Sequence, residues 1–389
     1  MARSVITNFN KMNTKTSYSQ YQNNLFEDNV QVSFLNDIKI IKNNRTYFLE
    51  RNTKFESFSP ENRRYLGNKN KLLGFIDDIV KDQCGEITSI CDIFAGTGVV
   101  GLNYNKSGIK VISNDILRSN YIPLKSFLQS DFLDTIRIKK LIDHLNGLNL
   151  DEENYFSENY GGTYFTIENA RKIGRIREEI EVLELSENEK SILLTSLIYA
   201  TDKVANTVGH YDAYRKIIDQ VQSVKLLVPN ISITNNKNNE VYCEDANELV
   251  KRIEVDVLYL DPPYNSRQYS DAYHLLENLV TWKKPEVFGV AKKMNRDNLK
   301  SRYCLKDATI AFQDLIKKAN CKHILVSYNN TGDSKDSRSN ARISDREMIE
   351  ILQRKGDLTI YEMSYKTFTT GKTKKDENIE RVFYCRVTK

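Results

Sequence analysis

Features that would mark several classes of protein are missing from this sequence. No apolar run approaches the ~18 residues that a membrane-spanning helix needs. The N-terminus, MARSVITNFNKMNTKTSYSQ, is polar and lacks the apolar stretch of a signal peptide. These absences argue against a membrane or secreted protein, and we expect a soluble, cytoplasmic protein with no membrane partner.

Cysteine and histidine are scarce and scattered. The six cysteines form no CxxC pair and no close cluster with any of the four histidines. Structural zinc sites and disulfide frameworks both depend on such spacings, so neither is expected and no metal site is predicted. Most of the cysteines should be small buried side chains. None of them follows a proline.

Length and charge set looser bounds. At 389 residues the chain is long for one domain, since a single core seldom grows past about 250–300 residues. One catalytic domain with a smaller inserted domain is the expected organisation. The net charge of +5 permits a polyanionic partner, and the 22 tyrosines suit base stacking as well as they suit a protein core.

The order of the apolar segments predicts an α/β fold. Residues 1–60 form a polar extension with short β-like pieces at 30–34 and 47–49. A helical face containing Leu72, Ile76 and Val80 comes next, then a strand at 89–94, a glycine turn and a second strand at 109–113. This order is the start of a parallel sheet covered by helices.

Residues 120–230 interrupt the sheet pattern. Ile173, Ile176 and Ile180 mark an amphipathic helix, and Ser186 with Glu189 matches the capping-box pattern for the next helix. We predict a catalytic domain made of residues 61–119 and 231–389, interrupted by a helical insertion at 120–230. Strands are expected to resume at 240–243, 255–260, 323–327, 358–362 and 382–387.

A glycine-rich segment follows the first predicted strand. In FAGTGVVG, Phe94 to Gly101, the glycines let the backbone turn tightly and approach a ligand closely. Asp115 ends the next predicted strand, where an acidic side chain can accept hydrogen bonds from both hydroxyls of a ribose. The pattern fits NAD and S-adenosylmethionine almost equally, and a merely tight strand-to-helix turn is the structural alternative.

Two further motifs accompany the glycine segment. Asp261-Pro262-Pro263-Tyr264 directly follows the apolar strand 255–260 and should lie on the same sheet edge, because ligands bind beyond the carboxyl ends of parallel strands. Pro-Pro can also simply end a strand, but the flanking carboxylate and aromatic ring favour a site. RRYLGNKNKLLGFI (63–76) places Lys69 at a helix start, where it suits either a ligand carboxylate or an ordinary basic helix end.

In this order the three motifs resemble those of the Dam-like (alpha-class) type II DNA adenine-N6 methyltransferases. RRYLGNKNKLL resembles their cofactor motif, DIFAGTGVVG their glycine motif and LDPPY their catalytic motif. The resemblance covers residues 63–115 and 240–270. It implies an α/β, Rossmann-like, seven-stranded methyltransferase sheet with an inserted, mainly helical target-recognition region. It also implies S-adenosylmethionine as cofactor and double-stranded DNA as partner.

The resemblance implies a role for each matching residue. The residues expected at the cofactor are Tyr65, Lys69, Phe94, Gly96, Gly98, Asp115, Asp245 and Asp261. The residues expected to hold the base are Asp261, Pro262, Pro263 and Tyr264. Many relatives accompany a restriction endonuclease, so the resemblance implies a modification enzyme, which we expect to be a monomer.

The chemistry of adenine explains why the catalytic motif has this composition. The lone pair of the exocyclic amino group is delocalised into the ring, so the nitrogen is a poor nucleophile. The Asp261 carboxylate and the rigidly held Pro262 carbonyl can accept hydrogen bonds from its two N–H groups and point the lone pair at a methyl donor. Tyr264 offers a face for stacking, and the base must leave the duplex to reach it.

DNA contacts are expected in two polar segments. The stretch TDKVANTVGHYDAYRK mixes basic and aromatic residues, and SRQYSDAYH follows the catalytic motif. A solvated helix end is the structural alternative for each residue. The candidates are Lys203, His210, Tyr211, Tyr214, Arg215, Lys216, Arg267, Tyr269 and Tyr273. A basic hairpin at 366–375 is a weaker candidate.

Several other functions remain as alternatives. An NAD-dependent dehydrogenase would leave the DPPY motif unexplained, and a cytosine-C5 methyltransferase needs a Pro-Cys nucleophile that is absent. A cytosine-N4 methyltransferase uses nearly the same chemistry, and an RNA or protein amino-group methyltransferase is the runner-up. A non-catalytic nucleic-acid-binding protein should have lost Asp261 or the glycines, and this chain keeps both.

Overall fold

The computed structural model describes residues 38–42, 45–49, 56–106, 108–149, 152–219, 222–263, 266–328, 343–365 and 378–388. The chain divides into two compact units, Met1–Glu56 and Ser57–Lys389. The first unit contains one antiparallel strand pair, β1 (Ile38–Lys42) with β2 (Arg45–Leu49). Strand β2 contains the predicted β-like residues 47–49, whereas the predicted piece at 30–34 lies outside the described residues.

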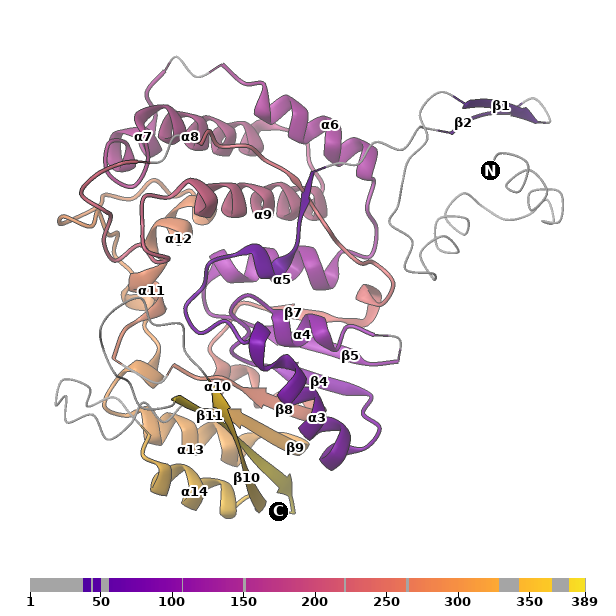
Figure 1. Cartoon of the computed structure of the whole chain (residues 1–389), viewed down its shortest axis with the longest axis vertical. Coiled ribbons are helices and arrows are strands. Elements are labelled where there is room, and N and C mark those ends of the chain that lie inside the picture. Colours follow the sequence, from indigo (N-terminus) through magenta and orange to yellow (C-terminus); the bar gives the residue numbers. More distant parts are fainter. Residues whose placement is uncertain are drawn as a thin grey trace. The chain divides into compact units, whose positions relative to one another are not determined.

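The second unit is built on a seven-stranded sheet with the strand order β10-β11-β9-β8-β4-β5-β7 (Figure 1). The strands are β4 (Ser89–Asp92), β5 (Lys110–Asn114), β7 (Glu240–Tyr242), β8 (Glu254–Leu260), β9 (Asn320–Ser327), β10 (Gly356–Tyr365) and β11 (Asn378–Val387). Strands β7, β5, β4, β8 and β9 are parallel, and β11 is antiparallel to both of its neighbours. Each strand overlaps a segment predicted from the sequence, so the α/β fold is confirmed.

Apolar side chains fill both faces of this sheet. Leu258 and Leu260 of β8 point to one face, while Val257 and Tyr259 point to the other, as the two-residue period of a strand requires. Burial on both faces explains why the central strands are continuous apolar runs. The first face is covered by α10 (Ala246–Leu249), α13 (Ala308–Lys318) and α14 (Asp345–Gln353), the second by α3 (Leu73–Cys84) and α4 (Val99–Asn103).

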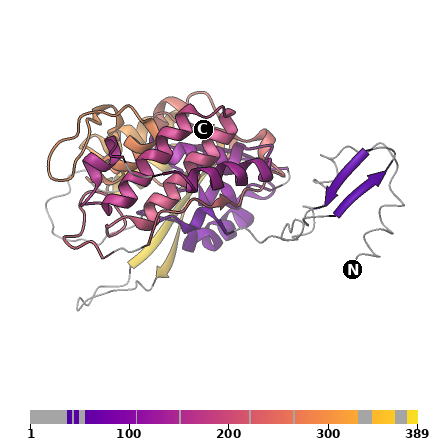
Figure 2. The same ribbon diagram turned by 90° about the horizontal axis from the view of Figure 1, so that it is seen from above.

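A further group of helices, which begins with α5, packs around its own apolar cluster, as Figures 1 and 2 show. Its members are α5 (Arg118–Gln129), α6 (Thr135–Asn146), α7 (Tyr155–Tyr160), α8 (Ile167–Val182), α9 (Glu187–Val204) and α12 (His274–Thr281). The predicted apolar face of α8 is buried, and the capping box of Ser186 and Glu189 is present at the start of α9. That this layer recognises the DNA target stays a prediction.

Two buried charged side chains fix α12 to its neighbours. The Arg177 guanidinium of α8 donates to the carbonyl oxygens of Leu279 (2.7 Å) and Val280 (3.1 Å) at the end of α12. The Glu277 carboxylate accepts from the backbone N–H of Ser119 (2.9 Å) at the start of α5. These bonds satisfy helix-end groups that would otherwise be buried without partners. They hold α12, which follows the catalytic motif, against the helix that follows β5.

The remaining elements are short. Strands β3 (Ser57–Phe58) and β6 (Val228–Pro229) pair in parallel, and α11 (Tyr269–Ala272) precedes α12. The 3-10 turns are η1 (Pro60–Asn62), η2 (Asn70–Leu72), η3 (Asn236–Asn238), η4 (Asp297–Leu299) and η5 (Arg302–Cys304). Three cysteines are buried and three are half-buried, and all six are free thiols. Within the described ranges, every helix is too short or too polar to cross a bilayer.

Candidate active site

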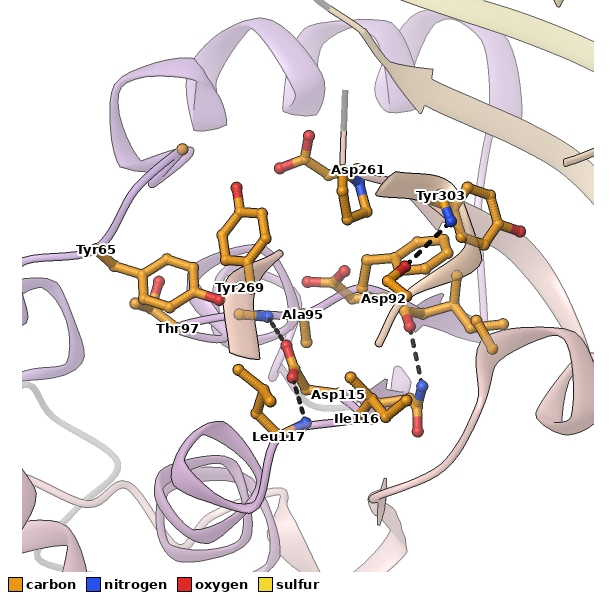
Figure 3. Close-up of a pocket in the computed structure, with 18 of the residues that line it drawn as sticks. Tyr65, Asp92, Ala95, Thr97, Asp115, Ile116, Leu117, Asp261, Tyr269 and Tyr303 are labelled. Atoms are coloured by element: carbon orange, nitrogen blue, oxygen red, sulfur yellow. Dashed lines mark hydrogen bonds between the residues drawn. The ribbon is translucent and has the colours of Figure 1, made fainter. Parts of the chain in front are cut away.

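A cavity of about 910 Å³, counting the solvent at its open mouth, lies at the carboxyl ends of β4, β5, β7 and β8 (Figure 3). The loop after each of these strands contributes to its wall, and residues 65–69 close one side. The three sequence motifs therefore meet at one edge of the sheet, as the parallel arrangement predicted.

The glycine segment makes the tight turn between β4 and α4. Gly96 and Gly98 both have left-handed backbones, with φ of 53° and 79°, which side chains other than glycine rarely adopt. A Cβ atom on Gly96 would lie 2.9 Å from the ring of Tyr65, and one on Gly98 would lie 2.4 Å from Cδ2 of Leu124. Both glycines are therefore required by the backbone, independently of any ligand.

Asp115 connects the glycine turn to the end of β5. Its carboxylate accepts from the backbone N–H of Gly96 (3.0 Å) and of Leu117 (2.8 Å), as Figure 3 shows. Burial raises the pKa of Asp115 to about 6, although these hydrogen bonds act in the opposite direction. The predicted ribose-binding acid is thus held rigidly at the cavity wall.

The catalytic motif and the predicted cofactor lysine meet directly. Nζ of Lys69 lies 2.9 Å from Oδ2 of Asp261, and both side chains are largely buried. Burial raises the pKa of Asp261, while the Lys69 ammonium lowers it. Pro263 also lines the cavity, and Pro262 is buried beside it. Tyr264 lies outside the described residues.

Three tyrosines stack along the wall formed by residues 65–69. The rings of Tyr65 and Tyr273 are parallel with centroids 4.6 Å apart, and Tyr269 lies 5.6 Å from Tyr65. The Tyr65 hydroxyl accepts from the Asn120 side chain (2.9 Å). Tyr65 and Tyr269 line the cavity, and Figure 3 shows their rings side by side.

The opposite wall comes from β4, β7 and the segment before α13. Phe94 packs edge-on against Tyr303, with centroids 4.9 Å apart, and both line the cavity. Asp245 also lines it, but its carboxylate caps α10 by accepting from the backbone N–H of Asn247 (2.8 Å) and Glu248 (3.2 Å). A structural role for Asp245 therefore accompanies the predicted cofactor contact.

Comparison with known proteins agrees with this geometry. The family model described as D12 class N6 adenine-specific DNA methyltransferase matches residues 65–330. The Type II methyltransferase M.NlaIII of Neisseria lactamica is 32% identical over 79% of this chain and 93% of its own length. The chain belongs to the D12 class of N6 adenine-specific DNA methyltransferases.

Two longer relatives match as well. The modification methylase StsI of Streptococcus sanguinis is 36% identical, and the Type II methyltransferase M.FokI of Planomicrobium okeanokoites is 34% identical. Each match covers 83% of this chain and 52% of the relative, so the chain spans about half the length of these two relatives. Family membership implies a methyl donor of the S-adenosylmethionine type.

Asp92 is a site residue that the sequence analysis missed. It ends β4, is 2% exposed and lines the cavity of this D12-class chain. Burial, together with the nearby charges of Asp261 and Asp115, raises the pKa of Asp92 well above its usual range. Its Oδ1 atom has no hydrogen-bond partner within the described residues. The signal in the sequence was an acidic residue in an otherwise apolar strand, directly before the glycine turn.

Two of the predicted DNA-contacting tyrosines are buried in this structure. Tyr211 is 1% exposed, and its hydroxyl donates to Oδ1 of Asp202 (2.6 Å). Tyr273 is fully buried, and its hydroxyl accepts from the backbone N–H of Leu66 (2.8 Å). Neither ring has surface to offer a duplex in this structure, because each fills space between the helical layer and the cofactor segment.

The other predicted DNA residues of this methyltransferase differ in exposure. Tyr214 is half-buried against Tyr164, and His210 lies 3.7 Å from the Asp212 carboxylate. Tyr269 belongs to the cavity wall. The exposed candidates are Lys203, Arg215, Lys216 and Arg267. Arg215 pairs with Asp219 (2.8 Å), and the hairpin at 366–375 lies outside the described residues. Contacts of these side chains with DNA stay predictions.

Proposed function

We propose that this chain transfers a methyl group from S-adenosylmethionine to the exocyclic amino group of adenine in double-stranded DNA. One observation carries the proposal: Asp261, directly after β8, faces the same cavity as the glycine turn and Asp115. Family membership supports the adenine specificity. The longer relatives extend well beyond this chain, so their names alone do not give the activity of this protein, and we infer it from the site and the family.

The cavity residues fit S-adenosylmethionine on the observations of this structure. The rigid Asp115 carboxylate would accept hydrogen bonds from the ribose hydroxyls, and Phe94 offers a ring face beside it. The buried Asp92 carboxylate, with an oxygen that lacks a partner among the described atoms, would accept from the ammonium group of the methionine part. When bound, the cofactor supplies an electrophilic methyl group on a sulfonium.

Lys69 is placed to serve two carboxylates. In this structure its ammonium pairs with Asp261, which compensates the buried charge of that residue. The predicted second partner is the carboxylate of the methionine part. An exchange of partners would release an oxygen of Asp261 to accept a hydrogen bond from the amino group of adenine. Lys69 therefore links cofactor occupancy to readiness of the catalytic carboxylate.

Asp261 and the Pro262 carbonyl would hold the amino group by its two N–H bonds. Transfer then depends on position and electrostatics, because the protein supplies no covalent partner. The base must leave the helix stack, which costs a few kcal/mol. Stacking beside the Tyr65 and Tyr269 wall, and on the predicted face of Tyr264, would offset part of that cost.

The activity is tested with purified protein, tritiated S-adenosylmethionine and plasmid DNA that lacks methylated adenine. Wild-type protein should label the DNA, and Asp261→Ala should lower the rate by at least about a hundredfold, as loss of one positioned acceptor usually does. Asp143→Ala, at an exposed acid of α6, is the control and should keep the wild-type rate. A wild-type rate for Asp261→Ala would exclude the catalytic assignment.

A second experiment separates adenine from the alternatives. DNA from cells that express the protein is sequenced by a method that distinguishes N6-methyladenine from N4-methylcytosine. N6-methyladenine at one recurrent sequence supports the proposal and gives the recognition sequence. N4-methylcytosine, or label found only in RNA or protein, would identify one of the other substrate classes.

The biological setting follows from the names of the relatives. StsI is named a modification methylase, and M.FokI and M.NlaIII are named type II methyltransferases. We infer that this chain protects host DNA as the modification enzyme of a restriction–modification system, with a cognate endonuclease as functional partner. A monomeric enzyme is expected, and light scattering of the purified protein measures its mass directly.

A further inference from the structure

The segment after α12 has a higher net positive charge than the chain as a whole. Residues 283–306, here called the basic arm, contain eight Lys and Arg against two Asp and Glu, a net charge of +6. The full chain has a net charge of +5. The basic arm therefore accounts for the basic character of the protein, although it was not among the sequence-predicted DNA segments.

The first part of the basic arm forms a tight turn with an apolar tip. Phe288 and Lys293 exchange two backbone hydrogen bonds (2.8 and 2.9 Å), and the N–H of Lys292 donates to the Gly289 carbonyl (3.1 Å). At the tip Phe288 is 56% exposed and Val290 is 81% exposed. The turn therefore presents two large apolar side chains to water side by side, within a segment of positive net charge.

The backbone of the basic arm is held in an uncommon conformation. Of the described residues other than glycine, the three with positive φ are Trp282 (48°), Lys284 (49°) and Lys292 (50°), at the start of the arm and in its turn. Such conformations persist only where surrounding contacts fix them, and they often mark functional segments. The turn is thus a shaped element rather than a loose connection.

The basic arm is anchored to the predicted DNA loop. Lys293 pairs with Asp212 (2.9 Å), and Arg296 pairs with Asp271 beside the catalytic segment. The Tyr164 hydroxyl lies within hydrogen-bond distance of the carbonyl oxygens of both Tyr211 (2.8 Å) and Ala291 (3.0 Å). Arg267 also approaches Asp212 (3.7 Å), so three segments converge at that carboxylate.

The basic arm also continues into the cavity wall. Leu299, Ser301 and Tyr303, near its end, line the cavity. The Gln268 side chain makes two hydrogen bonds to the backbone of Ser301, one accepted from its N–H (2.8 Å) and one donated to its carbonyl (3.0 Å). The arm is therefore positioned at the mouth of the same cavity that holds Asp261.

We propose that the basic arm is a DNA-binding element, with Lys283 and Lys292 on phosphates and Phe288 and Val290 inserted against a base step next to the extruded base. This inference rests on the proposed function. The charge of the arm complements a polyanion, and apolar tips that part stacked bases are a known mode of duplex binding. A protein partner is a weaker match, since two exposed apolar residues make a small patch within a strongly basic segment.

The tip is tested with the double variant Phe288→Ser/Val290→Ser. The control, Phe132→Ser/Val182→Ser, changes the same residue types at similar exposures, 64% and 75%, away from the cavity. Methyl transfer to plasmid DNA gives KM and kcat, and fluorescence anisotropy gives the affinity for a 30-base-pair duplex. The tip variant should raise the KM for DNA about tenfold, with affinity for S-adenosylhomocysteine unchanged, while the control resembles wild type.

The charge is tested with Lys283→Ala/Lys292→Ala. Each phosphate contact contributes about 0.9 to the slope of log affinity against log salt, so this variant should lower the slope by about 1.8. Lys140→Ala/Lys318→Ala, at exposed lysines of α6 and α13, is the control and should keep the wild-type slope. An unchanged slope for the arm variant would contradict the phosphate contacts.

Other outcomes would overturn the inference in different ways. An unchanged KM and unchanged anisotropy for the tip variant would exclude DNA insertion. Loss of self-association in the tip variant, with DNA binding intact, would make the tip a protein contact instead. Anisotropy measures duplex binding without methyl transfer, so it tests the basic arm independently of the enzymatic activity. If the wild-type protein methylates no DNA, the proposed function is excluded, and the anisotropy result still decides whether the arm binds DNA.

Discussion

Site residues were predicted from the sequence both at the sheet edge and in the loop after α9. In the structure, the predicted residues come together in one cavity at the sheet edge, whereas those of the loop differ in burial. At the sheet edge, Lys69, Asp115 and Asp261 all line one cavity. In the loop at 203–216, Tyr211 turns inward and is bonded to Asp202. The hydrogen bonds between neighbouring strands fix the positions of the strand ends, whereas the direction of a loop side chain depends on the residues that pack around it.

The two regions are joined by one buried charged network. The Arg63 guanidinium contacts Asp202 (3.2 Å), the Asn120 side chain (2.8 Å) and the rings of Tyr65 and Tyr273. Asp202 in turn accepts from Tyr211. The first residue of the cofactor motif therefore supports the start of the predicted DNA loop, and substitution of Arg63 tests this link between the two regions.

The largest expected effect comes from breaking that network. Arg63→Met removes the guanidinium and leaves the Asp202 carboxylate buried without its partner, which should lower the free energy of unfolding by about 3–5 kcal/mol. Urea denaturation measures the change. Arg346→Ala, at an 89% exposed side chain paired with Glu350, is the control and should cost less than about 1 kcal/mol. Equal effects of the two substitutions would show that the buried network does not join the regions.

The next effect sharpens the assignment of the sheet edge. Lys69→Met removes the ammonium that lowers the Asp261 pKa, so burial alone acts on that carboxyl and its pKa should rise. The carboxylate is then lost at higher pH, and the acid limb of the pH–rate profile should move upward. Methyl transfer at neutral pH should fall by about tenfold to a hundredfold. The test uses kcat/KM for S-adenosylmethionine, which reports the enzyme before the cofactor binds, and an unshifted acid limb of that parameter would mean that Lys69 does not act on Asp261 there.

The burial of Tyr211 and its hydrogen bond to Asp202 predict that a substitution there changes stability rather than DNA binding. Tyr211→Phe removes the hydrogen bond to the buried Asp202 and should cost about 2 kcal/mol in unfolding free energy, with the salt dependence of DNA binding unchanged. Tyr214→Phe, in the same loop but half-buried, is the comparison and should cost less than about 1 kcal/mol. A change in DNA affinity without a change in stability would support Tyr211 as a DNA-contact residue instead.

The smallest effect concerns pH and cofactor binding. Burial raises the pKa of Asp115 to about 6, and protonation below that value removes acceptors that the ribose hydroxyls would need. Affinity for S-adenosylhomocysteine should therefore fall as pH drops below about 6, approaching tenfold per pH unit. Calorimetric titration between pH 5 and 8 measures it. Asp115→Asn should bind more weakly at pH 8 and show a flatter pH dependence.

The cofactor side of the site was largely predictable, since its residues follow strands. The glycine turn, Asp115 and Asp261 are each adjacent to an apolar strand, so their meeting place followed from the parallel order. Asp92 was missed because an acid at a strand end usually has a structural partner, and only the structure shows that one of its oxygens lacks one among the described residues.

The basic arm was missed for another reason. Its eight basic residues were visible in the sequence, but they are interspersed with apolar and polar residues and match no motif. Its place at the cavity mouth depends on contacts with Asp212, Asp271 and Tyr164, which are remote in the sequence.

The sequence by itself determined the α/β sheet, the edge where the site lies and the family, because alternating apolar segments and the residues next to strand ends depend on local chain order. Only the tertiary structure decided that Lys69 pairs with Asp261, that Tyr211 and Tyr273 are buried, and where the basic arm lies. Those outcomes depend on packing between segments up to some two hundred residues apart, as between Leu66 and Tyr273, and no local pattern encodes such contacts.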